Sequence, residues 1–324
     1  MKNSIGAVVI GRNEGERLRK CLESVIYSSN IVVYVDSGST DNSIELAEKL
    51  GVDVVNLDVS IPFTAARARN EGFNRLHKLA PDLSFVQFID GDCEMDASWL
   101  DLASKYITKN PGVAIVCGRR RERYPDVSAY NMLCDIEWDT PVGEAKACGG
   151  DALMKISAFL QVEGFNPNLI AGEEPELCVR IRQQGWKICR LDLEMTLHDA
   201  NMTRFGQWWK RNVRSGYAFA LGEYLHGAKP EQHWVKEARR GRIWGGYIPF
   251  AIVLAILINP LYSLVAIIYP LQALRIGIKS RHKVSEYWKY AFFIILGKFP
   301  EMQGQFRFYF NQLFNSDSKI IEYK

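Results

Sequence analysis

The sequence predicts an α/β protein in which a mostly parallel sheet is flanked by helices and followed by an apolar helical segment. In the first half of the chain, short apolar runs alternate with longer stretches of helical character, which is the pattern of such a sheet. The run Phe85–Ile89 is mostly apolar, as expected for a buried parallel strand. Residues 243–274 contain no charged residue, and about 20 apolar residues suffice for one helical membrane span.

The individual elements follow from these patterns. We expect strands at Ile5–Ile10, Ile31–Asp36, Val52–Leu57, Phe85–Ile89 and Val113–Cys117. We expect helices at Glu14–Tyr27, Ser43–Leu50, Thr64–Leu79, Ala97–Thr108 and Glu173–Gln184. Right-handed crossovers put the carboxyl ends of parallel strands on one edge of the sheet. The polar loops that begin at Gly11, Asp36 and Asp90 should therefore converge there.

Composition narrows the class of protein. The 324 residues are 48% hydrophobic and 24% charged, which is ordinary for a globular protein. The net charge of +3 gives no reason to expect nucleic acid as a partner. Seven scattered cysteines without a C-x-x-C pair indicate reduced thiols in a cytosolic setting. Composition changes late in the chain, so we expect one domain at 1–235 and a basic, apolar helical region at 236–324.

Two carboxylates end the fourth expected strand. Asp90 and Asp92 are separated by one glycine, and ligands of open α/β sheets bind beyond the carboxyl ends of the strands. Carboxylate oxygens there suit Mg²⁺ or Mn²⁺, and such an ion would hold a diphosphate. His198 could supply a nitrogen ligand to the same ion. The alternatives are an acidic turn, because Asp and Gly are common turn residues, and a purely structural histidine.

Two further positions suggest nucleotide binding. Asp36 ends the second expected strand, where its carboxylate could accept hydrogen bonds from a base or a ribose; the alternative role for this loop is helix capping. Arg67 and Arg69 begin a helix, and the arginine fork suits phosphate. Residues two apart do not share a helix face, so only one of them should reach a nucleotide, and we favour Arg69.

Three carboxylates begin the expected helix after Gly172, at Glu173, Glu174 and Glu176. The helix dipole favours acidic residues in a first turn, which is the structural alternative. Three acids in four positions exceed what capping needs. One of them could act as a general base toward an attacking hydroxyl, and Glu174 is the favoured candidate.

Together these segments resemble the family 2 glycosyltransferases, which have the GT-A fold. The resemblance runs from residue 5 to about residue 215 and rests on an ordered set of motifs. These are the Asn-Glu turn after the first strand at Asn13 and Glu14, the acidic strand end at Asp36–Asp41, the Ala-Arg-Asn-x-Gly helix at Ala68–Gly72, the Asp-x-Asp motif at Asp90–Asp92, and the acidic helix start at Gly172–Arg180.

The resemblance implies an inverting, metal-dependent transfer of a sugar from a nucleotide sugar, with UDP as the expected nucleotide. The enzyme would be a hexosyl- or N-acetylhexosaminyltransferase acting on a hydroxyl of a lipid-linked or polysaccharide acceptor. Mn²⁺ or Mg²⁺ would be bound by Asp90, Asp92 and His198. The residues expected around the donor are Asn13, Glu14, Asp36, Arg69, Asp90, Gly149 and Gly150.

The chain departs from the family pattern in two places. Glu174 and Glu176 stand where aspartates are usual, so the base role requires a backbone set slightly further back. Gln207–Arg211 is at best a partial match to the Gln-x-x-Arg-Trp motif of processive synthases, which argues against a processive polymerase. It leaves an acceptor-side or interfacial role for Trp208 and Trp209, or simple packing against the apolar tail.

Two other classes of protein remain as alternatives. A non-catalytic nucleotide-sugar-binding scaffold would keep the fold without the chemistry, but the acidic residues around Asp90, Asp92 and Glu174 favour an enzyme. A nucleotidyltransferase would usually carry a glycine-rich, basic phosphate loop after the first strand. The segment Gly11–Gly15 matches that loop poorly.

The apolar segment indicates attachment to a membrane. Basic clusters flank it on both sides, at Lys236–Arg242 and Arg275–Lys283, and basic flanks favour the cytoplasmic side. Asn259-Pro260 divides it into halves of about 16 residues, about 24 Å as helix, which is short for a bilayer core. We expect a hairpin that enters the cytoplasmic leaflet of the inner membrane; two tilted spans and a buried core helix pair are the alternatives.

Overall fold

A computed structural model describes residues 4–314 of the chain. The chain divides into two compact units, Met1–Pro125 with Glu137–Asn201, and Asp126–Ile136 with Met202–Lys324. The boundary expected at residue 235 lies inside the second unit.

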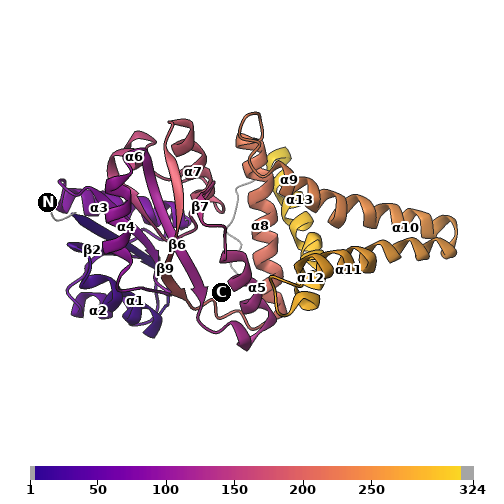
Figure 1. The fold of residues 1–324 in the computed structure, drawn as a ribbon, viewed down its shortest axis with the longest axis horizontal. Coiled ribbons are helices and arrows are strands. Elements are labelled where there is room, and N and C mark those ends of the chain that lie inside the picture. Colours follow the sequence, from indigo (N-terminus) through magenta and orange to yellow (C-terminus); the bar gives the residue numbers. More distant parts are fainter. Residues whose placement is uncertain (1–3, 315–324) are drawn as a thin grey trace. The chain divides into compact units, whose positions relative to one another are not determined.

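The first unit is built on one mixed sheet, in the strand order β3-β2-β1-β4-β8-β6-β9-β5 with β7 beside β9 (Figure 1). Its strands are β1 Ile5–Gly11, β2 Ile31–Asp36, β3 Asp53–Asn56, β4 Phe85–Asp90, β5 Cys93–Met95, β6 Val113–Glu122, β7 Gly143–Glu144, β8 Ala152–Lys155 and β9 Lys187–His198. The expected α/β class with flanking helices is confirmed. The sheet is less uniformly parallel than expected, because β8 runs antiparallel between β4 and β6.

Helices cover the sheet of the first unit. They are α1 Glu16–Ile26, α2 Ser43–Lys49, α3 Ala65–Leu79, α4 Trp99–Lys109, α6 Ile156–Gln161 and α7 Glu173–Gln183. The short η1 Pro125–Val127 and α5 Ala129–Trp138 lie where the two units divide. Thr64 caps α3 by accepting a hydrogen bond from the backbone N–H of Arg67, which satisfies one of the free donors of the first turn. A Cβ on Gly72 would lie 2.4 Å from Val8, so this glycine lets α3 pack closely on β1.

The strand register brings three loops to one edge of the sheet. Ile10 of β1 is paired with Asp90 of β4, and Gly11 is paired with Asp36 of β2. The loops after β1 and β2 are also joined directly, since Oδ1 of Asn13 accepts from the N–H of Thr40 at 2.7 Å. The first, second and fourth strands therefore end together.

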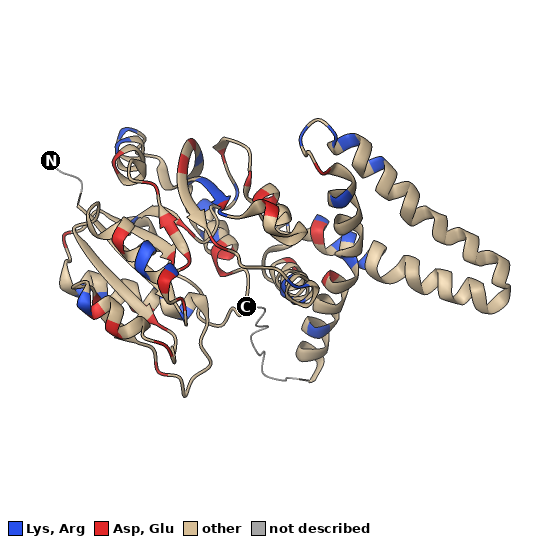
Figure 2. Ribbon diagram, turned by 90° about the horizontal axis from the view of Figure 1, so that it is seen from below, with Lys and Arg blue, Asp and Glu red and all other residues tan. Residues whose placement is uncertain are grey.

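The second unit is helical. Its helices are α8 Phe205–His226, α9 Val235–Arg242, α10 Ile248–Ile258, α11 Ile268–Ser280, α12 Tyr287–Leu296 and α13 Lys298–Phe314, with the π-helical η2 Ile243–Tyr247 and the 3₁₀-helical η3 Pro260–Ile267 between them. The segment from η2 to α11 doubles back at Asn259-Pro260 as a hairpin (Figure 1). Figure 2 shows charged residues near the base of this hairpin and none from there to its turn.

The hairpin arms are long, apolar and exposed. Val235–Ile258 and Pro260–Ser280 are long and apolar enough to cross a membrane, and only 11% and 6% of their most apolar stretches are buried. Leu257 and Leu264 near the turn are 77% and 75% exposed. Other described residues do not cover these side chains, which disfavours a buried core helix pair.

Backbone contact holds the base of the second unit together. A Cβ on Gly216 of α8 would lie 1.9 Å from the carbonyl oxygen of Glu301, and one on Gly304 of α13 would lie 2.0 Å from that of Val213. A Cβ on Gly245 of η2 would likewise lie 1.9 Å from the carbonyl oxygen of Lys298 on α13. These three positions accept no side chain without separating the helices.

Candidate active site

Asp90 lies between two arginines at the end of β4. Its Oδ1 accepts from Nη2 of Arg69 at 2.7 Å, and its Oδ2 accepts from Nη2 of Arg120 at 3.0 Å. Burial by itself would raise the pKa of Asp90, but the charges of Arg69 and Arg120 lower it well below its ordinary value. Asp90 is therefore ionised and engaged on both oxygens.

Arg69 links the Asp-x-Asp loop to the acidic helix. Its guanidinium is buried and also donates from Nη1 to Oε1 of Glu173 at 2.9 Å. Arg67 instead bonds the carbonyl oxygens of Ile61 and Asp58. The structure thus brings Asp90, Arg69 and Glu173 together and leaves Arg67 outside this cluster.

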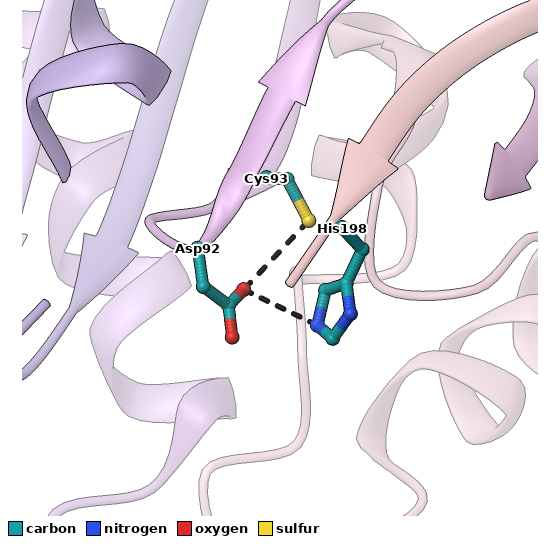
Figure 3. A group of neighbouring side chains, drawn as sticks. All are labelled: Asp92, Cys93 and His198. Carbon is teal, nitrogen blue, oxygen red and sulfur yellow. Dashed lines mark hydrogen bonds and ion pairs between the residues drawn. The ribbon is translucent and has the colours of Figure 1, made fainter. Parts of the chain in front are cut away.

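Asp92 faces His198 and Cys93 (Figure 3). Oδ1 of Asp92 lies 3.3 Å from Nε2 of His198 and 3.7 Å from the sulfur of Cys93. All three residues are buried. On the other side of the imidazole, Nδ1 lies 3.6 Å from Oε2 of Glu122.

This pair of side chains fits a divalent cation. Burial lowers the pKa of His198, and the charge of Arg120 lowers it further, so a neutral imidazole nitrogen is available at neutral pH. An oxygen and a nitrogen 3.3 Å apart are close enough to share one ion, and Glu122 is placed as the carboxylate that orients a metal-binding histidine. Carboxylate and imidazole together suit Mn²⁺ better than Mg²⁺, which prefers oxygen alone.

The segment Cys148–Asp151 runs between the two acidic regions. Oδ1 of Asp151 accepts from the backbone N–H of Asp90 at 3.0 Å. A Cβ on Gly150 would lie 2.9 Å from Oδ2 of Asp90 and 3.1 Å from Arg69, so only glycine fits against the charged cluster. Gly149 has a φ of +81°, a conformation that glycine adopts without strain.

Glu174 is held by two cysteines. Its Oε1 accepts from the backbone N–H of Cys148 at 2.6 Å and from the thiols of Cys148 and Cys178, each at 3.0 Å. Burial raises the pKa of Glu174 above its ordinary value, and these hydrogen bonds moderate the rise. A buried carboxylate with a raised pKa is suited to accepting a proton.

The other predicted positions have structural partners. Glu176 pairs with Arg180 at 2.8 Å, one turn along α7. Asp36 accepts from the hydroxyl of Tyr34 at 2.9 Å and from the backbone of its own loop, at the N–H groups of Gly38 and Ser39. Its nucleotide role remains a prediction.

Glu14, predicted near the donor, and the two tryptophans predicted near the acceptor also have partners within their own units. Glu14 pairs with Arg17 at 2.7 Å. Trp208 is buried within the second unit, with ring centroids 5.1 Å from Phe293 and 6.1 Å from Tyr130. Nε1 of Trp209 donates to Gln303 at 2.8 Å.

Arg120, Glu122, Asp151 and the pair Cys148 and Cys178 were not predicted as site residues from the sequence. The expected strand ended at Cys117, whereas β6 continues to Glu122, so Arg120 and Glu122 were not placed beside the site. A run of three arginines after a buried strand was the available signal for Arg120. Asp151 follows directly on the predicted Gly149-Gly150 loop. Nothing in the sequence pairs Cys148 with Cys178.

Comparison with known proteins gives one matching family. Residues 7–144 match the model described as glycosyl transferase family 2. This segment includes Asp36, Arg69, Asp90 and Asp92 and ends before the acidic helix.

Individual proteins that the chain resembles are also named as glycosyltransferases. Glycosyltransferase AglE of Haloferax volcanii is 24% identical over 225 residues, which is 65% of this chain and 71% of that protein. O-antigen chain rhamnosyltransferase RfbN of Salmonella typhimurium is 24% identical over 196 residues, 56% of this chain and 60% of that protein. Among solved structures, the mannosyltransferase PcManGT from Pyrobaculum calidifontis in complex with GDP-Man and Mn²⁺ aligns with a TM-score of 0.64 at 16% identity, covering 93% of this chain and 86% of that one.

Proposed function

We propose that this chain, a family 2 glycosyltransferase with the GT-A fold, transfers a sugar from a nucleoside diphosphate sugar to a hydroxyl of a lipid-linked or glycan acceptor. The transfer inverts the configuration at the anomeric carbon. The observation that carries the proposal is the ion-pair chain from Asp90 through Arg69 to Glu173. It joins the end of β4 to the start of α7, which are the places where the donor diphosphate and the base are expected.

Asp92 and His198 are the proposed ligands of Mn²⁺ or Mg²⁺. Such an ion, when bound, would offset negative charge on the departing diphosphate. Arg69 and Arg120 each donate to Asp90, which fixes the carboxylate and keeps positive charge beside the Asp-x-Asp loop. This arrangement holds the diphosphate end of the donor in one orientation.

Glu174 is the proposed base. Its raised pKa and its position next to Glu173 suit removal of a proton from an acceptor hydroxyl. A single displacement needs one base and one leaving-group stabiliser, so no carboxylate nucleophile is required. Glu173 is tied to Arg69 and Glu176 to Arg180, whereas among the described residues Glu174 is held by Cys148 and Cys178.

The donor nucleotide is expected at the loops after β1 and β2, around Asn13 and Asp36. We propose UDP as the first candidate, and GDP as the second because the mannosyltransferase of similar fold was solved with GDP-Man. Asn13 and Ser39 already bind each other across the two loops at 2.9 Å, so the loops form one surface for a base and ribose.

The hairpin of the second unit is the proposed membrane anchor. Its exposed apolar arms and charged base suit insertion into the cytoplasmic leaflet of the inner membrane, with the basic flanks at the headgroups. A lipid-linked acceptor would then be presented at the same surface. Aromatic residues of the second unit such as Trp209 are proposed to lie at this interface.

The test is a panel of nucleotide sugars incubated with the purified full-length chain in detergent. We expect release of nucleoside diphosphate from one donor, in the presence of Mn²⁺, and its loss in EDTA. With the accepted donor and a lipid-linked acceptor, NMR of the product should show the anomeric configuration opposite to that of the donor. Binding of a donor without release or transfer under any condition would favour the non-catalytic scaffold.

A further inference from the structure

A second cluster of metal-binding side chains surrounds Glu174. The sulfurs of Cys148 and Cys178 lie 3.7 Å apart, and each lies 3.0 Å from Oε1 of Glu174. Cys148 is 7% exposed, Cys178 is 0% exposed and Glu174 is 6% exposed. Their ligand atoms all lie within 4.8 Å of one another. We propose that Cys148, Cys178 and Glu174 form a site for a thiophilic divalent cation such as Zn²⁺, separate from the Asp92–His198 pair.

The distances favour a cation over a disulfide. Two thiolates on a tetrahedral zinc, at about 2.3 Å from the ion, lie about 3.8 Å apart. The sulfurs of Cys148 and Cys178 already have this separation, at 3.7 Å. A disulfide would require them to approach to about 2.05 Å. The oxygen of Glu174 would withdraw slightly, because a zinc-bound carboxylate oxygen lies about 3.6 Å from the thiolates.

The ligand types separate this site from the one at Asp92. Two thiolates and one carboxylate select soft or borderline ions such as Zn²⁺, whereas Mg²⁺ and Mn²⁺ prefer oxygen-rich sites. Three protein ligands leave a fourth position for water or an anion. Mn²⁺ would therefore occupy Asp92 and His198, and Zn²⁺ would occupy the cysteine pair.

Zinc at this site would stop sugar transfer. This consequence rests on the proposed function, in which Oε1 or Oε2 of Glu174 accepts the proton of the acceptor hydroxyl. A carboxylate that binds Zn²⁺ is a much weaker base and is fixed in place. Zn²⁺ would thus inhibit the enzyme even when Mn²⁺ is saturating, and the cation itself would bind whether or not Glu174 is the base.

The first experiment uses Co²⁺ alone as a spectroscopic substitute for Zn²⁺, with the full-length chain in detergent. We expect the visible bands of a tetrahedral ion and a thiolate-to-cobalt charge-transfer band with the intensity of one thiolate-bound Co²⁺ per chain. Co²⁺ at Asp92 and His198 would add no thiolate band. Cys178→Ser and Cys148→Ser should each weaken Co²⁺ binding by more than about 100-fold, beyond the 10–100-fold that loss of an outer partner usually costs. Zn²⁺ added to the cobalt form should bleach both sets of bands.

Two matched cysteine variants test the location. Cys117→Ser removes a buried thiol on β6 whose sulfur faces the carbonyl oxygen of Cys189 at 3.9 Å, and Cys93→Ser removes the thiol beside Asp92. Both should keep the thiolate band. A band that is lost in Cys93→Ser and kept in Cys178→Ser would show that the thiol of the Asp92 site is the ligand, and the proposal would be wrong.

The unmodified chain provides a measurement that does not depend on any variant folding. X-ray absorption at the zinc edge should show two sulfur neighbours at about 2.3 Å, and one sulfur or none would overturn the proposal. Zinc inhibition is then measured with the accepted donor and acceptor in saturating Mn²⁺, where Cys178→Ser should be at least about tenfold less sensitive than the parent chain. An inactive parent chain would count against the proposed function, while the absorption result would still decide the cation site.

Discussion

The Nε2 atom of His198, the last residue of β9, lies 3.3 Å from Oδ1 of Asp92, which lies in the loop between β4 and β5. The imidazole is sandwiched between two carboxylates, because its Nδ1 faces Glu122 at 3.6 Å. A histidine in this position would normally become more basic. Here burial and the neighbouring charge of Arg120 lower its pKa instead, which keeps the ring neutral and ready to bind a cation.

Substitution at this pair should weaken Mn²⁺ binding. Asp92→Asn and His198→Ala each remove a proposed ligand, and Glu122→Gln removes only the residue that orients the imidazole. We expect Glu122→Gln to lower Mn²⁺ affinity by about 10–100-fold, and the two ligand variants to lower it further, as measured by electron paramagnetic resonance of free Mn²⁺. Asp101→Asn, which loses an exposed ion pair with Lys105, is the control and should bind Mn²⁺ normally. Unchanged affinity in His198→Ala would remove this histidine from the site.

The base assignment predicts a defect in the chemical step. Glu174→Gln keeps the size of the side chain and removes its basicity, so kcat should fall by about 10²–10⁴-fold while donor binding, measured by calorimetry, stays close to that of the parent chain. Glu176→Gln is the matched variant on the same helix and loses an ion pair with Arg180. A larger fall in kcat for Glu176→Gln than for Glu174→Gln would transfer the role to Glu176.

The thiols around Glu174 predict a shift of the pH profile. A base works only when deprotonated, so the rate should be lost as pH falls through the pKa of Glu174, which burial raises. The thiols of Cys148 and Cys178 lower that pKa by donating to the carboxylate. Cys178→Ala removes one donor and should move the acidic limb of kcat/KM to higher pH. Cys178→Ser keeps a donor, so its acidic limb should stay near that of the parent; an identical shift in both variants would contradict the hydrogen-bond explanation.

The ion-pair chain predicts a loss of stability. Arg69→Met leaves Asp90 and Glu173 without their shared partner, and breaking a buried ion pair costs about 3–5 kcal/mol of the free energy of unfolding. Arg67→Met removes a neighbour whose guanidinium donates to the loop carbonyls of Ile61 and Asp58 and should cost about 1 kcal/mol. Because the pKa of Asp90 is lowered in the folded state, its contribution is present above the ordinary carboxyl pKa and is lost as pH falls toward the folded value. Denaturant unfolding at neutral and acidic pH measures the free energy of unfolding of both variants. Equal values for Arg69→Met and Arg67→Met at neutral pH would mean that the Arg69 ion pairs do not stabilise the fold.

The hairpin predicts binding to lipid. Leu257→Asp and Leu264→Asp place a carboxylate near its turn, where each should oppose insertion by about 2.5–3.5 kcal/mol if the site reaches the bilayer core. Flotation with anionic vesicles should therefore show the parent chain with the lipid and the double variant largely in solution. Tyr27→Asp, at a position that is 93% exposed in the first unit, is the control. A parent chain that is soluble without detergent and stays out of the lipid fraction would refute the anchor.

Local patterns were enough to predict the elements that converge on the site. The strands that end at Gly11, Asp36 and Asp90 were predicted within one residue, because each is an apolar run bounded by polar turns. The short strands β7 and β8 have two and four residues, too few to show a period. Their place in the sheet is decided by pairing with β9, β4 and β6, which lie far away in the sequence.

Local patterns likewise predicted part of the candidate site, and contacts between distant segments decide the rest. Helix geometry predicted that Arg67 and Arg69 lie on different faces, and the structure places the favoured Arg69 against two carboxylates. Arg120 resembles its neighbours in a basic run and is distinguished only by the acids that surround it in the folded chain. Cys148 comes from a loop and Cys178 from α7, so their contact arises from tertiary structure alone.

The three glycines at the base of the helical unit restrict how this enzyme can diverge. Positions 216, 245 and 304 lie where two main chains touch, so a mutation to any larger residue would push the helices apart. The exposed apolar positions near the turn of the hairpin, such as Leu257 and Leu264, carry no comparable restriction, since one apolar side chain there can replace another. Over evolutionary time the hairpin sequence should therefore drift freely in detail, while the helical base that supports it stays nearly fixed.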